Sequence, residues 1–155
     1  MYAENFEIRP DSTRAAALLK QAAEGGIAPA QADYGLMVYQ GNGTTRSAED
    51  AAQWFKKAAN GGDAEGRFLY AFTLAKGDGI AQSYEDAYYW LLKADADSGD
   101  SEVAEYNQDR AELKKRLEDN VPAEVLQRAR DRVQREKSAN LVSNVTIPML
   151  PGAGQ

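Results

Sequence analysis

Residues 51–62 read AAQWFKKAANGG, and the pattern returns 36 residues later as AYYWLLKADADSG at 87–99. A weaker copy, AAALLKQAAEGG, precedes both at 15–26. In each copy alanines and larger apolar residues recur at i, i+3, i+4 and i+7, which is one stripe of an α-helix, and one or two glycines follow. Repeats of this length are typical of stacked two-helix units, none of which can bury its apolar face alone. The sequence therefore predicts a helical solenoid.

The segments between these copies supply the second helix of each unit. Pro29 suits a first helical turn, and Ser47 and Ser83 are potential N-caps one repeat apart. Gly-x-Gly breaks recur at 41–43 and 77–79, where glycine can adopt left-handed backbone at low strain. The sequence predicts about seven helices, over the approximate ranges 11–24, 29–40, 48–60, 63–76, 84–97, 100–117 and 122–138. Trp54 and Trp90 are expected to be buried at equivalent places in successive repeats.

The run Ala-x-x-Trp-x-x-x-Ala, followed by glycines and a closing Gly-x-Gly, resembles the Sel-one-like repeat family, a 36-residue relative of the tetratricopeptide repeat. The resemblance is clearest at Ala51, Trp54, Phe55, Ala58, Gly61 and Gly62 and again at Ala87, Trp90, Leu91, Ala94 and Gly99. It implies an all-α, right-handed α-α superhelix of two-helix repeats with C-terminal capping helices, which bacterial members often have. Together with the residue pattern, it divides the chain into four expected segments: a lead-in at 1–11, repeats at 12–99, capping helices at 100–138, and an extended apolar tail at 139–155.

Composition narrows the class of protein. The 155 residues are 43% hydrophobic and 27% charged, as expected of one globular unit, and they include neither cysteine nor histidine. No run approaches the roughly 18 apolar residues that a membrane span needs. The net charge of −6 opposes binding to phosphate backbones, so nucleic acid is not expected as the main partner. A membrane is not expected as a partner either. As the sequence stands it predicts a cytoplasmic protein, or a periplasmic one if a leader has been removed.

Neither catalysis nor a cofactor is expected. The carboxylate pairs Glu49-Asp50 and Glu85-Asp86 fall where a first helical turn favours negative charge. No calcium-loop, Walker or Ser-x-x-Lys motif occurs. The Gly-x-Gly segments recur with the repeat, which favours a turn over a phosphate cradle. The sequence offers no catalytic, cofactor-binding or metal-binding residues, and an enzyme is not expected.

A surplus of large side chains indicates a binding surface for a partner protein. The candidate contact residues are Leu36, Tyr39, Arg67, Phe72, Tyr88 and Tyr89. Exposed aromatic residues in a groove are common anchors for peptides, although these residues could instead cover neighbouring units. The helices at 29–40 and 63–76 are expected to form this face. The basic residues of the last helix suit either a solvated capping helix or a contact with an acidic partner or a membrane surface.

Two functions follow from these observations. The first is a non-enzymatic adaptor or scaffold that holds a partner peptide or domain in the groove of its repeats. The alternative is a structural or accessory subunit of a larger assembly, anchored by the tail. The tail contains Leu141, Ile147 and Pro148 and carries no charge, so it is expected to lie against an apolar surface of the same chain or of a neighbour.

Overall fold

The computed structural model describes residues 8–98 and 104–144, and within these ranges α-helix is the only regular secondary structure. Seven helices occur there, which confirms the predicted all-α fold. They are α1 (Ile8–Glu24), α2 (Ala28–Gln40), α3 (Ala48–Asn60), α4 (Ala64–Lys76), α5 (Tyr84–Ser98), α6 (Ala104–Asn120) and α7 (Ala123–Asn144). None of the helices in the described ranges is long and apolar enough to cross a bilayer.

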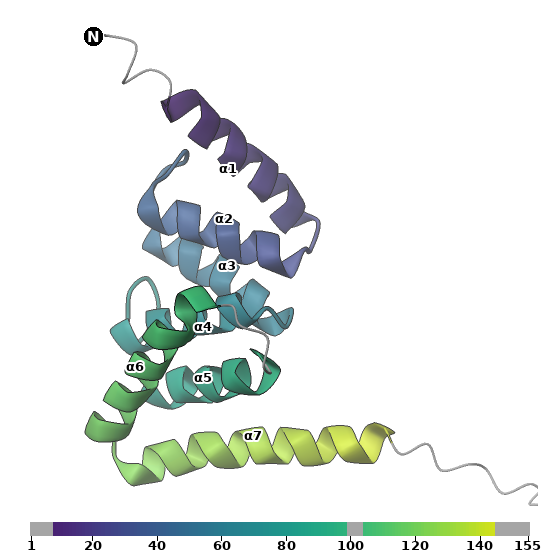
Figure 1. The fold of residues 1–155 in the computed structure, drawn as a ribbon, viewed down its shortest axis with the longest axis vertical. Coiled ribbons are helices and arrows are strands. Elements are labelled where there is room, and N and C mark those ends of the chain that lie inside the picture. Colours follow the sequence, from purple (N-terminus) through teal and green to yellow (C-terminus); the bar gives the residue numbers. More distant parts are fainter. Residues whose placement is uncertain (1–7, 99–103, 145–155) are drawn as a thin grey trace, which may run out of the picture.

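The helices form a stack in chain order. Helices α1 to α5 follow one another along the long axis, α7 lies beside α5 at the end, and α6 crosses obliquely over α4 and α5 (Figure 1). The pairs α2–α3 and α4–α5 are the two complete repeats, and each pair packs extensively on itself and on its neighbour. This arrangement leaves α2, α4 and α6 to line one common side, where the candidate site lies.

The serines and glycines that recur with the repeat lie at the ends of these helices, as predicted. The Ser47 hydroxyl accepts a hydrogen bond from the backbone N–H of Asp50, and the Ser83 hydroxyl accepts one from Asp86, both at 3.2 Å. Such N-caps satisfy backbone donors that a helix leaves free at its start. Gly41 and Gly77 then end α2 and α4 in left-handed backbone, with φ of 69° and 71°. Equivalent residues therefore have equivalent roles in the two repeats.

The two tryptophans occupy equivalent sites, as predicted, but neither is fully buried. The ring of Trp54 lies 5.3 Å from that of Tyr34, and the ring of Trp90 lies 5.7 Å from that of Tyr70. Both indoles are half-buried. Each packs one side against its own repeat while a lysine ammonium approaches it, Lys57 at 4.5 Å and Lys93 at 5.2 Å. The cation–π contact favours leaving part of the indole near water.

Two residues of the apolar stripe of α1 are exposed. Ala15 and Leu18 follow the same pattern as Ala51 and Trp54 of α3, which are buried and half-buried, yet both are exposed. The buried alanines of α1 are Ala16 and Ala23, which face α2. The stripe has the correct helical period, but no described helix covers it.

Both ends of the helical array differ from the prediction. Helix α1 begins at Ile8, because Pro10 falls in its first turn, where the missing N–H costs no hydrogen bond. Helix α7 extends to Asn144, so residues 139–144 are helical and not part of an extended tail. No proline or glycine occurs between the start of α7 at Ala123 and Pro148 to end this helix earlier. The rest of the predicted tail, 145–155, lies outside the described residues, as does most of the predicted lead-in.

Candidate functional site

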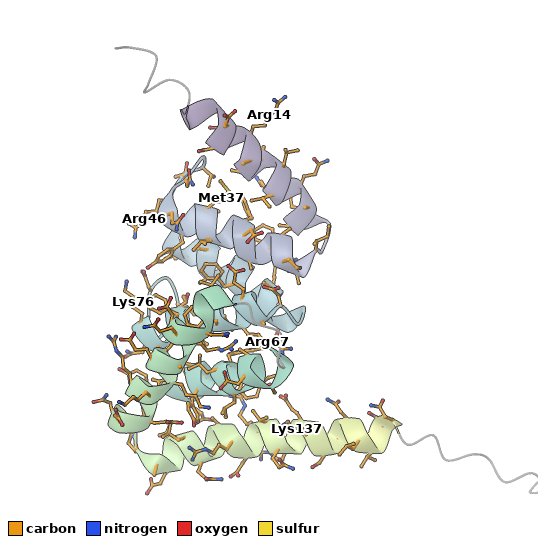
Figure 2. All side chains as sticks on the ribbon, viewed as in Figure 1. Arg14, Met37, Arg46, Arg67, Lys76 and Lys137 are labelled. Carbon is orange, nitrogen blue, oxygen red and sulfur yellow. The ribbon has the colours of Figure 1, made fainter. Side chains whose placement is uncertain are left out.

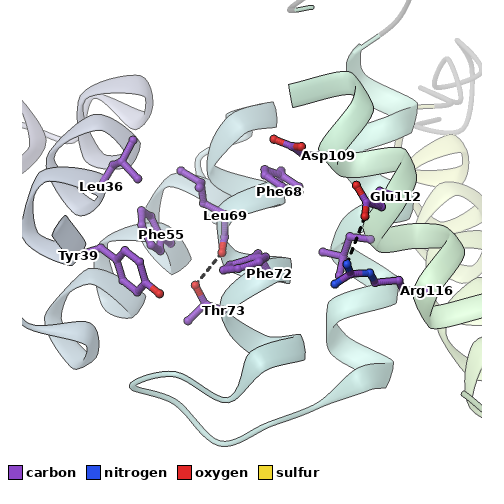
Figure 3. A pocket seen from close by; sticks show the side chains of 11 residues that line it. Leu36, Tyr39, Phe55, Phe68, Leu69, Phe72, Thr73, Asp109, Glu112 and Arg116 are labelled. Atoms are coloured by element: carbon purple, nitrogen blue, oxygen red, sulfur yellow. Dashed lines mark hydrogen bonds and ion pairs between the residues drawn. The ribbon is translucent and has the colours of Figure 1, made fainter. Parts of the chain in front are cut away.

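The candidate site is an apolar pocket of about 320 Å³ on the side of the stack formed by α2, α4 and α6 (Figure 3). We call this pocket the groove. Its apolar lining consists of Leu36, Tyr39, Phe55, Phe68, Leu69, Phe72 and Leu113, and its polar lining of Thr73, Asp109, Glu112 and Arg116. Three of the predicted contact residues, Leu36, Tyr39 and Phe72, therefore lie together. They come from two successive repeats, which is the arrangement that the repeat pattern predicts.

Hydrogen bonds fix the orientation of Tyr39 at the edge of the groove. Its hydroxyl donates to the Asp78 carboxylate at 2.8 Å and accepts from the Lys76 ammonium at 3.3 Å. Asp78 lies in the Gly77-x-Gly79 turn of the next repeat, so the contact joins two repeats. Arg46 donates to the Tyr39 carbonyl at 3.1 Å, with its guanidinium 5.9 Å from the ring centroid. The Tyr39 ring is thus held in place before any ligand binds, which reduces the entropy cost of binding.

Phe72 is the most accessible aromatic residue of the groove, with 40% of its surface exposed. Its ring lies 6.5 Å from that of Phe68, and the Lys76 ammonium lies 5.8 Å from its centroid. Phe72, Leu113 and Arg116 also line a second, wider pocket of about 620 Å³ between α4 and α6. The two pockets therefore meet at Phe72. Together they offer an apolar surface with a charged rim, which can accept apolar side chains of an elongated segment.

Sequence reasoning missed the contribution of α6. This helix was predicted only as a capping helix, yet it supplies Asp109, Glu112, Leu113 and Arg116 to the groove. Glu112 accepts a hydrogen bond from Arg116 one turn later, at 3.2 Å (Figure 3). The available signal was the pair Leu113 and Leu117, four residues apart in an otherwise polar segment, which indicates one narrow apolar contact.

Arg67 does not join the groove. It is buried within the helix stack (Figure 2) and donates hydrogen bonds to the carbonyls of Ala59 and Lys93, both at 3.3 Å. Gln31 makes the equivalent bond one repeat earlier, to the Ala23 carbonyl at 3.1 Å. Burial lowers the pKa of the Arg67 guanidinium, although nearby acidic groups oppose this. Arg67 therefore ties α4 to its neighbours, a structural role that Gln31 performs for α2.

Tyr88 and Tyr89 are also absent from the groove, because they are buried between α5 and the last two helices. The Tyr88 hydroxyl donates to Glu118 at 2.8 Å and accepts from Arg130 at 3.0 Å. The Tyr89 hydroxyl donates to Glu136 and accepts from Lys93 at 3.2 Å. Both tyrosines thus hold the C-terminal helices on the last repeat.

The basic residues of α7 mostly pair with α5. Arg128 contacts Glu85 at 2.9 Å, Arg132 contacts Asp86 at 2.6 Å, and the Arg132 guanidinium lies 4.0 Å from the Tyr89 ring centroid. The carboxylates of Glu85 and Asp86 belong to the first turn of α5, where negative charge is favoured. This pairing supports the capping-helix interpretation of α7 over that of a membrane-binding or acidic-partner surface.

The Tyr89–Glu136 bond makes stability depend on pH at the alkaline end. Burial and the bond to Glu136 raise the pKa of Tyr89 to about 12, whereas a tyrosine in an unfolded chain has a pKa of about 10. Between these values the unfolded chain loses the proton and the folded chain keeps it, so the free energy of unfolding falls as pH rises. For Glu136, burial alone would raise the pKa, but the bonds from Tyr89 and Lys93 outweigh it and lower the pKa.

We therefore expect Tyr89→Phe to lose stability less steeply than the wild type between pH 10 and 12. Urea unfolding at pH 9 and pH 11 measures the difference. Burial raises the pKa of Tyr70 and Tyr88 as well, so the decline should become shallower but should not vanish. An identical decline in both proteins would contradict the assignment of this titration to Tyr89.

Among the residues that the structure describes, no group of three or more histidine, cysteine, aspartate or glutamate side chains is placed to hold a metal ion. The groove instead combines aromatic and aliphatic side chains with a few charges, on a scaffold of repeated helical pairs. These features define the class of the protein as a helical-repeat solenoid. Such repeats commonly mediate protein interactions.

Comparison with known proteins identifies the repeat. The Sel1 repeat pattern matches residues 2–27, 28–63 and 64–94, which together make up more than half of the chain. The chain belongs to the Sel1 repeat family. No curated protein is significantly similar to it.

Two solved structures share this architecture. A Sel1 repeat protein from Oxalobacter formigenes is 30% identical over 57% of this chain, with a TM-score of 0.54. A protective antigen of uropathogenic Escherichia coli strains, c5321, displays the same fold over 92% of this chain, at 22% identity and a TM-score of 0.68. The chain spans only 36% and 30% of these two proteins. The second match extends past the three recognised repeats and shows that the C-terminal helices also fit this fold.

Proposed function

We propose that the protein is a non-enzymatic adaptor that holds a segment of a partner protein in the groove. The observation that carries the proposal is the meeting of Leu36, Tyr39 and Phe72 around an open pocket of about 320 Å³. The pocket is large enough for one or two apolar side chains. Aromatic residues that are pre-positioned in such pockets commonly provide most of the binding energy of an interface.

The chemistry of the groove defines the segment that it fits. Its floor is apolar, so the anchor of the partner should be a large apolar side chain. Its rim carries Asp109 and Glu112 on α6 and Lys76 and Arg116 near Phe72, so charges of both signs can flank the anchor. An amphipathic segment can offer polar groups to these charges, which a continuous apolar peptide cannot, so the amphipathic segment should bind better.

Site-specific photocrosslinking tests the proposal in native extract. We would replace Phe72 with p-benzoylphenylalanine and, as the matched control, place the same group at Gln53, an exposed position on α3 that does not line the groove. The proposal predicts one discrete crosslinked partner from position 72 and none from position 53, with loss of the product when Tyr39 is also changed to alanine. Equal labelling from both positions would contradict a groove-bound partner.

A second function, a structural subunit of a larger assembly, is favoured by one observation. The last turns of α7 expose Leu141 and Val142, at 69% and 75% of their surfaces, beyond the part of α7 that packs on α5. Two adjacent exposed apolar residues at the end of a helix could anchor the chain to a neighbour.

Deleting residues 139–155 separates the two functions. If the protein is an adaptor, the shortened protein should keep its thermal midpoint and its affinity for the groove-bound partner, because the residues that line the groove and those that hold α7 on α5 lie outside 139–155. Differential scanning calorimetry and a binding titration measure both quantities. A subunit would instead lose its stoichiometric complex in size-exclusion chromatography while the groove stays intact, and this result would favour the second function.

A further inference from the structure

The second pocket, which we call the wide pocket, differs from the groove in the sign of its charges. It lies between α4 and α6, has a volume of about 620 Å³, and meets the groove at Phe72. Its charged lining residues are Lys76 and Arg116, and no carboxylate is found among the described residues that line it. The carboxylates of Asp109 and Glu112 line the groove instead. The wide pocket is therefore the cationic side of the combined surface.

Tyr84 adds a hydroxyl donor to the wide pocket. The side-chain amide of Gln82 donates to the Ala75 carbonyl at 2.8 Å and to the Tyr84 hydroxyl at 2.9 Å. Because a carbonyl can only accept, the Gln82 nitrogen uses one hydrogen there and the other on the Tyr84 oxygen. The Tyr84 hydroxyl is thus an acceptor within the protein, and its own proton can be donated to a ligand. Tyr84 is 44% exposed, so a ligand can reach it.

The two cations of the wide pocket have loosely held partners. The Lys76 ammonium lies 3.8 Å from the Asp78 carboxylate and donates to the Tyr39 hydroxyl at 3.3 Å. The Arg116 guanidinium lies 3.2 Å from the Glu112 carboxylate, and both of these side chains are more than half exposed. Ion pairs between exposed side chains contribute little free energy. A carboxylate brought by a ligand can therefore compete with Asp78 and Glu112 for these cations.

We propose that the wide pocket accepts an acidic side chain of the partner, next to the apolar anchor that the groove holds. Lys76, Arg116 and Tyr84 supply donors for its carboxylate, and this charge complementarity selects an acidic residue over a basic one. The apolar lining of the pocket suits the methylene groups of such a side chain; it consists of Phe72, Ala75, Leu113, Leu117 and Val121. The inference rests on the proposed function, since the anchor in the groove places the acidic residue.

Short peptides with a single apolar anchor test this charge preference. The probes are acetyl-GSGFEEGSG-amide and its reverse, acetyl-GSGEEFGSG-amide, which cover both chain directions, and the same two peptides with glutamine in place of glutamate. Each is titrated into the isotopically labelled full chain while the backbone amide signals are followed by NMR. We expect saturable shifts at Phe72, Lys76, Tyr84 and Arg116 with a glutamate peptide. Its glutamine counterpart should bind about fivefold more weakly, as expected for the loss of exposed ion pairs.

Substitutions in the chain assign the preference to the wide pocket. The double variant Lys76→Gln/Arg116→Gln should bind the glutamate and glutamine peptides equally. The matched control, Lys56→Gln/Lys115→Gln, removes the same charge from exposed residues outside both pockets and should keep the preference for glutamate. Tyr84→Phe keeps the ring and removes the hydroxyl, so it should lose part of the preference.

Two results would overturn the proposal: equal binding of the glutamate and glutamine peptides by the wild type, or equal loss of the preference in the two double variants. The second result would show that the net charge of the chain, and not the wide pocket, attracts the peptide. If the peptides still shift Leu36 and Phe72 in either case, the groove and the proposed function stand. If no peptide shifts Leu36 or Phe72, both the acidic preference and the groove are contradicted.

Discussion

Gly79→Ala should lower the free energy of unfolding by about 3 kcal/mol. Gly79 has a φ of +74°, and left-handed backbone costs a residue with a Cβ roughly 1–2 kcal/mol. An added Cβ would also overlap the carbonyl group of Ala48 at the start of α3, and backbone atoms there have little freedom to move. Overpacking of this kind costs about 1–3 kcal/mol. Urea denaturation followed by circular dichroism measures the total.

Gly26→Ala is the matched control. Gly26 has a φ of +89°, but no atom lies within 4 Å of its added Cβ, so only the backbone strain remains. We expect a loss of about 1–2 kcal/mol for this variant. Equal losses in the two variants would show that the approach of the Gly79 turn to α3 contributes nothing to stability. A larger loss for Gly79→Ala would assign the difference to contact between successive repeats.

The fold could be predicted largely from the helix caps and glycine turns that recur with the repeat. Helix α3 ends at Asn60 and helix α4 at Lys76, both as predicted, because glycine follows each of them. The predicted caps at Ser47 and Ser83 also form. These signals are local, since a cap or a turn needs only a few neighbouring residues. They can therefore be recognised in a single sequence.

Burial was harder to predict than helix position. Leu18 follows the same pattern as Trp54 and Trp90, yet its exposure depends on whether another helix covers it. The periodicity of one helix cannot show this, because it records which residues share a face and not what packs on that face. The predicted end of α7 was wrong for a related reason. Residues 139–144 lack charge and a clear period, but they also lack a residue that breaks a helix.

The candidate site could be predicted in part. Leu36, Tyr39 and Phe72 lie off the stripe that packs within each repeat, and the repeat offset places them on one side of the stack. Tyr88 and Tyr89 were assigned to a surface because their partners could not be inferred: Glu136 lies 47 residues from Tyr89, on a helix outside the repeat pattern. Arg67 is a similar case, since its acceptors are backbone carbonyls on two other helices.

The double substitution Tyr39→Ala/Phe72→Ala should weaken binding of the groove partner by about 2 kcal/mol, or roughly thirtyfold, as expected for two aromatic anchors. Phe72 is exposed and Tyr39 half-buried, and both helices end in glycine caps that the changes do not touch. Helical content should therefore be preserved. Tyr39→Phe keeps the ring and removes only the hydroxyl's bonds with Asp78 and Lys76, so it should have a much smaller effect.

Isothermal titration of the partner identified by photocrosslinking, with the wild type and with this double variant, tests the groove most directly. The matched control is Leu141→Ala/Val142→Ala, which truncates two exposed apolar side chains on α7. The groove assignment predicts a loss of about thirtyfold in affinity for the double variant and unchanged affinity for the control. Unchanged affinity in Tyr39→Ala/Phe72→Ala, with circular dichroism identical to that of the wild type, would contradict it and move the binding site to another surface.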